Sequence, residues 1–554
     1  MPKLKNLFHV PQTHYPTKTI VRWLWSAWRG NRVQAAINAA LGLVDVALSL
    51  GQVWAVKHAI DIASGAVPGN IFVAVGIMAL LILGNFGCSI ASISVRNILG
   101  VRSQNWMQQR MLDRILRAEW RGRNSMHSGD LINRLEGDVN NVIVFLTETI
   151  PTTLSVVALF VGAFFCLFSM DKLLACLLIV VIPFFMLVSR FYVGKMRYFT
   201  RKVRDADSKV QSALQEAVQR RIVIKALEAR EVVEDNLERT QSILRHNVVR
   251  RTRFSIMSGL TINMGFAVGY MVAFLWAAVR MMGHTLTFGG MTAFLQLVNK
   301  VQSPARSLTK LVPAFVSVLT AAERLMEIEG VPLETQGESV RLSAPCGVRL
   351  DGVTFRYSDG DKDVLNEVSF DFRPGSCTAV LGETGVGKTT LVRLLLALVK
   401  PTEGDIKMYD ASGEHSITPL LRCNFAYVSQ GNTLMSGTIR SNLLLGNPDA
   451  SDDDIREALH QSCADFVFDL PKGLDTRCGE QGGGLSEGQS QRISIARALL
   501  RRCPVLLFDE ATSALDGATE RQLLQNILKN NAHTVIFITH RLAVLDYCDG
   551  EIRL

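Results

Sequence analysis

Six long apolar stretches constrain the fold of this chain more than any other feature of its sequence. They are roughly Val33–Ala63, Ile71–Leu99, Val142–Met170, Leu173–Tyr192, Ile256–Met282 and Phe288–Val318. A helix needs about 20 mainly apolar residues to cross the hydrocarbon core of a bilayer, and each stretch reaches or approaches that length. One such stretch also fits a buried core helix, but six in series predict an α-helical transmembrane domain with six spans.

Basic residues between the stretches predict the orientation in the membrane. The connections "SGAVPGN", "SMDK" and "GHTLT" hold a single lysine, whereas the N-terminal segment, Arg96–Arg134 and Arg190–Arg253 are rich in lysine and arginine. The positive-inside rule therefore predicts that these basic segments and both chain ends are cytoplasmic. The net charge of +9 lies mostly there, so no nucleic-acid partner is expected. The polar start predicts no secretory signal, and the unpaired cysteine spacing predicts free thiols.

The two basic segments between spans are long but not loop-like. Residues 210–249 have helical periodicity and almost no glycine or proline, so long helices are expected to continue beyond the spans. The stretch "SMHSGDLINRLEGDV" interrupts this pattern at Ser128-Gly129-Asp130, which resembles a helix stop and restart. We interpret it as a short crosswise helix at the tip of a hairpin.

A phosphate-binding loop is predicted in the second part of the chain, where short β-branched runs separated by turns follow a linker at about 329–347. The segment "GSCTAVLGETGVGKTT" fits G-x-x-x-x-G-K-[ST] from Gly382 to Thr389. Backbone N–H groups of such a loop surround phosphate oxygens, Lys388 reaches the β- and γ-phosphates, and the Thr389 hydroxyl binds Mg²⁺. The alternative is a tight glycine turn with an exposed lysine.

Two acids end an apolar run in "CPVLLFDEATSALD". The run predicts a buried parallel strand, and an α/β sheet binds ligands at the carboxyl ends of its strands. Asp509 is expected to hold Mg²⁺ directly or through water, and Glu510 to polarise the attacking water. Together with the phosphate loop, these acids predict nucleotide hydrolysis.

A second glycine-rich helix start, "GEQGGGLSEGQSQR", also has the features of an anion site. Its "LSEGQ", Leu485–Gln489, resembles the signature motif of ATP-binding cassette (ABC) proteins and lies between the phosphate loop and the "LLFDE" strand. The chain therefore resembles an ABC exporter with the membrane domain and the ATPase fused as a half-transporter. The resemblance implies a transmembrane domain at 1–328 with cytoplasmic coupling helices, a linker, and an α/β P-loop ATPase domain at 348–554.

The resemblance implies roles for further residues. Tyr357 in "VTFRY" resembles the aromatic residue that stacks on adenine, Gln430 in "AYVSQ" the glutamine that senses Mg²⁺, Asp516 in "SALD" a dimer contact, and His540 in "ITHR" the switch histidine. The implied catalytic set is Glu510, His540 and Gln430, and the implied Mg²⁺ set is Thr389, Gln430 and Asp509. The implied ATP set is Tyr357, Gly382, Glu383, Thr384, Gly385, Val386, Gly387, Lys388, Thr389, Thr390, Ser486, Gly488, Gln489 and Asp516.

The two anion sites imply a dimer. In the family, ATP lies between the phosphate loop of one chain and the signature helix of another, so Ser486 and Gly488 are expected to bind the γ-phosphate held by the partner's Lys388. A homodimer is favoured, and a heterodimer with a related half-transporter is the alternative. By resemblance, the short helices near Gly129–Leu135 and Gln219–Lys225 pass the motion to the membrane, and Glu480 contacts the second of them.

Two departures from the family pattern qualify the resemblance. Glu487 occupies a position that is commonly glycine, and hydrolysis is expected to survive because Ser486 and Gly488 are kept. The chain also ends soon after His540, where family members usually continue, so some loss of dimer stability is an open expectation.

The resemblance predicts export or flipping of an amphiphilic substrate, a lipid, drug or small peptide, across a bacterial inner membrane. A nucleotide-gated channel, a regulatory ABC protein and a soluble cassette ATPase are the alternatives. Charged side chains inside spans are functional candidates, so Asp45 and Lys300 are hypothesised to line the substrate cavity or to pair with one another. Asn85, Gln296 and Asn299 are further polar candidates.

Overall fold

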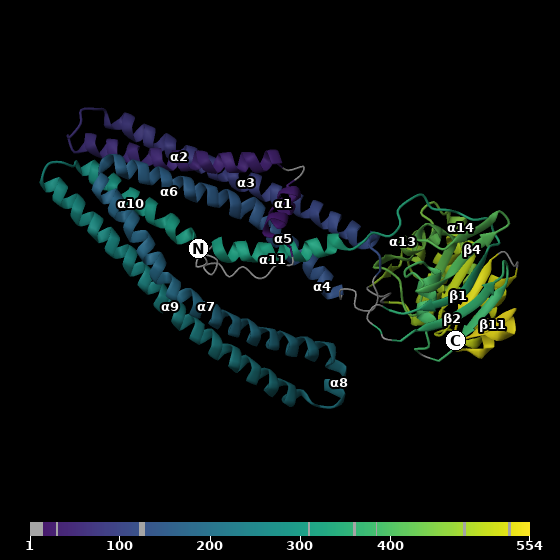
Figure 1. Cartoon of the computed structure of the whole chain (residues 1–554). Coiled ribbons are helices and arrows are strands. Elements are labelled where there is room, and N and C mark those ends of the chain that lie inside the picture. Colours follow the sequence, from purple (N-terminus) through teal and green to yellow (C-terminus); the bar gives the residue numbers. More distant parts are fainter. Residues whose placement is uncertain are drawn as a thin grey trace. The chain divides into compact units, whose positions relative to one another are not determined.

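The structure is a computed structural model, and it describes residues 15–28, 32–120, 128–308, 311–357, 360, 362–383, 385–479, 484–529 and 533–554. The chain divides into two compact units (Figure 1). The helical unit comprises Met1–Arg110 and Ile132–Met326, and the sheet unit comprises Met111–Leu131 and Glu327–Leu554.

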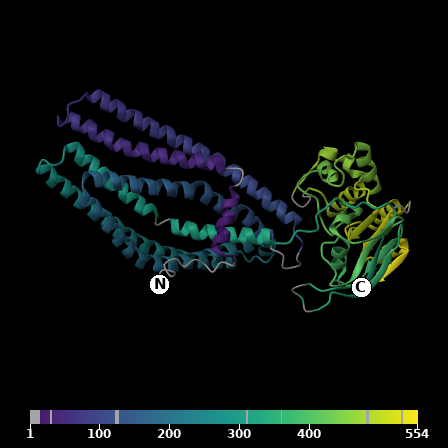
Figure 2. The same cartoon turned by 45° about the horizontal axis from the view of Figure 1, so that its top comes forward.

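The helical unit consists of long helices joined by short turns, as Figures 1 and 2 show. Its elements, some of which continue into the sheet unit, are α1 (Thr17–Ala27), α2 (Arg32–Ala63), α3 (Ile71–Arg117), α4 (Ser128–Asn133), the π-helical turn η1 (Arg134–Asp138), α5 (Val139–Val144), the π-helical turn η2 (Phe145–Thr149), α6 (Ile150–Met170), α7 (Lys172–Gln219), α8 (Arg221–Ala226), α9 (Arg230–Met282), α10 (Phe288–Leu308) and α11 (Leu311–Gly330). Each of the six apolar stretches falls in this helical series, which confirms the predicted fold class.

Four helices in the described part of the chain are long and apolar enough to cross a membrane. They are Arg32–Ala63, Ile71–Arg117, Gly129–Met170 and Arg230–Met282. The other two predicted spans lie in α7 and in the pair α10 and α11, so the order of helices fits six spans while those two remain a prediction.

Several helices extend well beyond a bilayer span, as the sequence predicted. The helix α3 has 47 residues, α7 has 48 and α9 has 53, against about 20 for one crossing. The prediction of a short crosswise helix near Gly129–Leu135 is wrong: these residues begin a helix that continues through two π-helical turns to Met170. The helix α8 is a separate short helix, as predicted near Gln219–Lys225.

The interior of the helical unit is built from small and apolar side chains of α2, α6, α9 and α10, including Val53, Ala163, Ala273 and Phe294. Inside a membrane the hydrophobic effect does not drive helices together. Small residues instead let the helices approach closely enough to pack well. Asp61 of α2 is buried and accepts a hydrogen bond from the backbone N–H of Gly289 at 3.1 Å, so a polar contact also joins α2 to α10.

The sheet unit has an α/β core, which confirms the predicted second domain. Its strands are β1 (Gly347–Phe355), β2 (Leu365–Phe372), β3 (Cys377–Leu381), β4 (Glu403–Asp410), β5 (Gly413–Ser416), β6 (Phe425–Val428), β7 (Gly437–Thr438), β8 (Arg477–Cys478), β9 (Val505–Asp509), β10 (Thr534–Ile538) and β11 (Gly550–Arg553). Its helices are α12 (Lys388–Leu395), α13 (Ile439–Leu444), α14 (Asp452–Gln461), α15 (Phe466–Asp469), α16 (Glu487–Leu500) and α17 (Gly517–Leu528), with 3₁₀ turns η3 (Pro419–Asn424), η4 (Gly473–Asp475) and η6 (Leu542–Tyr547).

Two larger sheets organise the sheet unit. A parallel sheet has the order β11-β3-β10-β9-β6, and an antiparallel sheet has the order β2-β1-β4-β5. Every residue of β3, β9 and β10 is buried, as expected for parallel strands covered on both faces. Because these strands are parallel neighbours, their carboxyl ends meet at one edge of the sheet, and the segments after them lie close together.

A segment of the chain that precedes the third predicted span also belongs to the sheet unit. The guanidinium of Arg114 donates to the carbonyl of Val331 at 2.9 Å, and Ala118 forms an antiparallel bridge with Leu333. The sequence did not indicate this association. The predicted boundaries at 328 and 348 stay a prediction.

Candidate functional site

The predicted phosphate loop lies between β3 and α12. Gly385 and Gly387 have φ angles of +94° and +117°, a region that residues with a Cβ rarely adopt. A Cβ at Gly387 would lie 2.8 Å from Leu365 and 3.0 Å from the carbonyl oxygen of Val364, so glycine is also required for space. The loop ends at the first turn of α12, where free N–H groups and the helix dipole favour an anion.

The first three side chains of α12 differ in their burial and in their hydrogen-bond partners. The buried Lys388 donates to the carbonyl oxygen of Gly382 at 2.5 Å, so its ammonium group stays inside the curve of the loop. Thr389 is exposed, whereas Thr390 is buried and its hydroxyl bonds that of Tyr357 at 3.0 Å. The exposed Thr389 hydroxyl is therefore the one available to a metal ion.

Asp509 ends β9, as predicted, and is almost completely buried. Burial raises the pKa of Asp509, and the hydroxyl of Tyr427, which donates to Oδ2 at 3.2 Å, acts in the opposite direction. The charge of Lys388 also lowers this pKa, so the lysine of the phosphate loop stabilises the ionised acid.

Glu510 is the meeting point of the three predicted catalytic residues. Gln430 Nε2 donates to Glu510 Oε2 at 2.6 Å, and His540 Nδ1 lies 3.6 Å from Glu510 Oε1. The backbone of Glu510 has a φ of +50°, an uncommon conformation that the hydrogen bond from its N–H to the carbonyl of Ile538 holds at 2.9 Å. These residues follow β6, β9 and β10, which are neighbours in the parallel sheet.

The predicted signature residues form the start of α16. The hydroxyl of Ser486 accepts from the N–H of Gln489 and the Gln489 side chain accepts from the N–H of Ser486, which is a complete capping box. A Cβ at Gly488 would lie 2.8 Å from the carbonyl oxygen of Ala514, so this glycine allows α16 to approach the "SALD" loop. Glu487 is exposed at the positive end of the helix dipole, a favourable place for an acid.

The "SALD" loop is tied to the residue after the predicted switch histidine. Arg541 donates to the carbonyl oxygens of Ser513 at 2.7 Å and Leu515 at 3.2 Å, and pairs with the buried Glu520 at 2.9 Å. Asp516 caps α17 by accepting from the N–H groups of Ala518 and Thr519. Its expected dimer contact stays a prediction.

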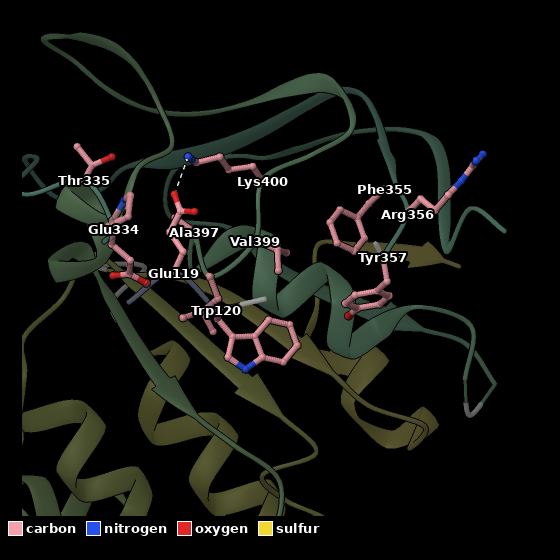
Figure 3. A pocket seen from close by; sticks show the side chains of 12 residues that line it. Glu119, Trp120, Glu334, Thr335, Phe355, Arg356, Tyr357, Ala397, Val399 and Lys400 are labelled. Carbon is pink, nitrogen blue, oxygen red and sulfur yellow. Dashed lines mark hydrogen bonds and ion pairs between the residues drawn. The ribbon is translucent and has the colours of Figure 1, made fainter. Parts of the chain in front are cut away.

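Tyr357, the predicted adenine partner, lies in an aromatic cluster with Phe355 and Trp120. The ring centroids of Tyr357 and Phe355 are 4.8 Å apart, and those of Tyr357 and Trp120 are 6.4 Å apart with planes at 74°. Figure 3 shows these rings around a pocket, with Lys400 and Glu119 joined at its other side. The pocket has a volume of about 260 Å³.

Four residues of the site were missed by sequence reasoning. They are Tyr427, Arg393, Arg541 and Trp120. Tyr427 and Arg541 lie next to predicted residues in "AYVSQ" and "ITHR", so those motifs held a usable signal. No signal links Trp120 to Tyr357, because only the tertiary fold brings these segments together.

The donor set fits the expected Mg²⁺. Thr389, Gln430 and Asp509 offer a hydroxyl, an amide carbonyl and a carboxylate, the hard oxygen ligands that Mg²⁺ prefers alongside water and phosphate. The Gln430 amide nitrogen is the atom bonded to Glu510, which leaves its carbonyl oxygen for a ligand. Thr384 of the ATP set and Glu480, the expected coupling contact, lie outside the described residues.

The charged residues of the helical unit have separate hydrogen-bond partners. Asp45 Oδ1 accepts from Asn85 Nδ2 at 2.9 Å, and Lys300 Nζ donates to the hydroxyl of Ser49. Both charges are half-buried, and both partners come from α2 or α3. Neither hydrogen bond joins Asp45 to Lys300, but the two opposite charges lie close enough to attract each other. Both versions of the hypothesis therefore stay open.

Two family models match the chain. The model of the ABC transporter transmembrane region matches residues 36–304, and the ABC transporter model matches residues 365–513. Together they match residues in both units.

Proteins similar over most of their length carry the names of flippases and export proteins. The "ATP-dependent lipid A-core flippase" of Bordetella avium is 30% identical over 465 residues, which is 82% of this chain and 77% of that protein. The protein of the same name from Dechloromonas aromatica is 31% identical over 458 residues, or 81% of this chain and 77% of that protein. A Staphylococcus aureus protein named for multidrug export is 29% identical over 428 residues, or 76% of this chain and 74% of that protein.

A solved structure of a bacterial Atm1-family ABC exporter with ATP bound has the same fold. It aligns with a TM-score of 0.77 at 22% identity and covers 95% of this chain and 93% of that chain.

Proposed function

The chain belongs to the ABC transporters, with the membrane region and the ATP-binding cassette on one polypeptide, and we propose that it flips or exports an amphiphilic lipid as a homodimer. ATP-driven transport follows from the family. The site residues, the dimer, the lipid class and the orientation are the parts that we propose.

One observation carries the ATPase assignment: the carboxylate of Glu510 has Gln430 and His540 as neighbours on its two oxygens. Its side chain is 18% exposed and that of His540 is 61% exposed, so the acid lies deeper than the histidine. A carboxylate held in this way is oriented to accept a proton from a water molecule, which is the role of a general base. The exposed imidazole is placed to contact the phosphate that the water attacks.

The phosphate loop supplies the binding side of the reaction. The glycine turns and the first turn of α12 present N–H groups to the phosphates, and Lys388 adds a positive charge. Mg²⁺, held by Thr389, Gln430 and Asp509, would neutralise phosphate charge when bound. The Tyr427 hydroxyl fixes one oxygen of Asp509 and so orients the other.

The presence of two separate predicted anion sites in one chain, the phosphate loop and the start of α16, supports a dimer. The signature helix α16 has an exposed N-terminus whose cap, Ser486, is satisfied by its own chain, and its acidic neighbour Glu487 faces solvent. We infer that this end receives the γ-phosphate of a nucleotide held by a second copy, with Ser486 and Gly488 closest to it. A heterodimer with a related half-transporter remains the alternative partner.

The lipid class is supported by the relatives and by the surface of the helical unit. Two of the relatives are named as lipid A-core flippases. The helical unit combines large exposed apolar side chains with half-buried polar residues Asp45, Asn85 and Lys300, a pairing that suits an amphiphile. We place the protein in a bacterial inner membrane with both ends and the sheet unit in the cytoplasm, as the distribution of basic residues predicts.

The test is ATP hydrolysis by the full chain in lipid nanodiscs, with Glu510→Gln beside the wild type. We expect the variant to bind ATP and to lose hydrolysis by about a hundredfold or more, because a general base contributes about 10²–10⁴-fold. Glu457→Gln, an exposed acid on α14, is the matched control and should retain activity. Lipid A and an ordinary phospholipid are then compared as stimulators of the wild type.

Three results would count against parts of the proposal. Wild-type hydrolysis that persists in Glu510→Gln would remove Glu510 as the base. An ATP-binding but inactive wild type would remove the homodimer and favour a partner chain. Equal stimulation by both lipids would remove the lipid A class as the preferred substrate.

A further inference from the structure

The backbone next to Trp120 is hydrogen-bonded to another segment of the sheet unit. The N–H of Glu119 donates to the carbonyl of Pro332 at 2.9 Å, and the N–H of Glu334 donates to the carbonyl of Arg117 at 2.9 Å. Glu334 in turn binds Arg422 through both carboxylate oxygens at 3.0 Å. These contacts fix the backbone next to Trp120, so its ring has a defined place beside Tyr357.

The indole of Trp120 supports the guanidinium of Arg393. Arg393 Cζ lies 4.4 Å from the centroid of the Trp120 ring, a close cation–π contact. From this position Arg393 Nη1 donates to the hydroxyl oxygen of Tyr357 at 2.7 Å. A half-buried arginine on α12 is thus held between the two aromatic residues.

The Tyr357 hydroxyl has a second partner on the same helix. Arginine has donors only, so the Tyr357 oxygen is the acceptor in its bond with Arg393. The same oxygen lies 3.0 Å from Oγ1 of the buried Thr390, and either hydroxyl can be the donor of that bond. Two residues of α12 therefore hold the Tyr357 hydroxyl in place.

We propose that Trp120 and Arg393 are positioning residues of the nucleotide site, which fix the ring of Tyr357 for the adenine. This inference rests on the proposed function, because it takes Tyr357 as the residue that receives the base. It adds to the site a residue from outside the predicted ATPase domain, three positions after the end of α3. Trp120 nevertheless belongs to the sheet unit.

The experiment measures nucleotide binding and hydrolysis by the full chain in nanodiscs, with ATP and UTP as the two probes. We expect Trp120→Ala to raise the Kd and KM for ATP by about two- to thirtyfold, the range of one cation–π contact, with kcat within about twofold. UTP should be affected less because its smaller base stacks less well, so the preference for ATP over UTP should fall. Trp120→Phe, which keeps an aromatic face, should retain most of the affinity.

Arg393→Met and the double variant test the connection between the residues. If Trp120 acts through Arg393, Arg393→Met should weaken ATP binding to a similar degree, and the double variant should be little worse than either single variant. Trp106→Ala is the matched control, since Trp106 of α3 carries Arg110 at 5.3 Å in the same kind of contact within the helical unit. It should leave nucleotide binding unchanged.

Several outcomes would overturn the inference. They are a Trp120→Ala protein that binds ATP as the wild type does, equal weakening for ATP and UTP, or additive effects in the double variant. If Trp120→Ala does not fold, judged by thermal unfolding and gel filtration, Arg393→Met alone carries the test. A wild type that neither binds nor hydrolyses ATP would contradict the proposed function instead, so the two failures are distinguishable.

Discussion

The helical unit and the sheet unit place their apolar side chains in opposite ways. In the helical unit, Phe72 is 83% exposed and Leu80 is 72% exposed, whereas in the sheet unit Phe508 is 2% exposed within a buried strand. The hydrophobic effect makes the first arrangement unfavourable in water and neutral in lipid. The same residue types are therefore a core in one unit and a lipid-facing surface in the other.

Polar residues show the reverse relation. In the sheet unit they gather at the carboxyl edge of the parallel strands, where Gln430, Glu510 and His540 meet. In the helical unit the polar side chains of Asp45 and Lys300 lie between helices, each with a neutral partner. In both units the functional candidates are therefore the residues whose polarity differs from that of their surroundings.

The largest expected effect contrasts the same truncation in the two units. Phe508→Ala should reduce the free energy of unfolding of the sheet unit by about 3–5 kcal/mol, because it leaves a cavity and removes the stacking on Phe537 at 4.9 Å. Phe72→Ala should cost less than about 1 kcal/mol, because its side chain faces outward. Thermal unfolding in nanodiscs measures both, and equal losses would contradict the contrast between the units.

The second prediction concerns the buried acid Asp509. Asp509→Asn should reduce hydrolysis by about a hundredfold, comparable to the loss of one preorganised electrostatic interaction in other active sites. The same variant should unfold at a higher temperature at neutral pH. Burial raises the pKa of Asp509 in the folded state, so its ionised form costs stability as the pH rises through that pKa.

The pH dependence of stability separates burial of Asp509 from other causes. The stability gain of Asp509→Asn should be constant where the pH lies well above the raised pKa of Asp509, and should shrink as the pH falls from that pKa to the ordinary pKa of 3.8. Below 3.8 the carboxyl is neutral in both states, so the gain should not change further. Glu457→Gln, at an exposed position on α14, should show no such trend. A gain for Asp509→Asn that does not change with pH would contradict the burial explanation.

The third prediction tests the polar residues of the helical unit. Asp45→Asn keeps a side chain that accepts from Asn85 and removes only the charge. If this charge meets the substrate, stimulation of hydrolysis by lipid should fall about fivefold, or about 1 kcal/mol, while basal hydrolysis stays the same. Unchanged stimulation and transport would remove Asp45 from the substrate path.

The smallest expected effect makes the same acid-to-amide change on the surface of the sheet unit. Glu487→Gln removes a favourable charge from the N-terminus of α16, which is worth about 0.3–1 kcal/mol. Hydrolysis should stay within about twofold, because Ser486 and Gly488 are kept. A large loss of hydrolysis would instead place Glu487 at the phosphate.

Much of the site could be predicted because each motif is local. Three parts of the site depend on residues a few positions apart: the phosphate loop, the acids at the end of β9 and the start of α16. Glycines and helix-capping residues indicate the backbone conformation that each part needs. The prediction of a short crosswise helix was wrong for a related reason. Ser128-Gly129-Asp130 marks the start of a helix, but a local pattern does not show how far that helix continues.

Hydrophobic periods and short motifs were enough to predict a helical membrane domain followed by an α/β ATPase domain, and to propose the residues that bind and hydrolyse nucleotide. These signals can be read from the chain because they act through neighbouring residues. The contact of Trp120 with Arg393, the hold of Arg541 on the "SALD" loop, and the separate partners of Asp45 and Lys300 emerged only in the folded molecule. Such contacts join segments far apart in the chain, and their geometry depends on the packing of whole elements rather than on any local pattern.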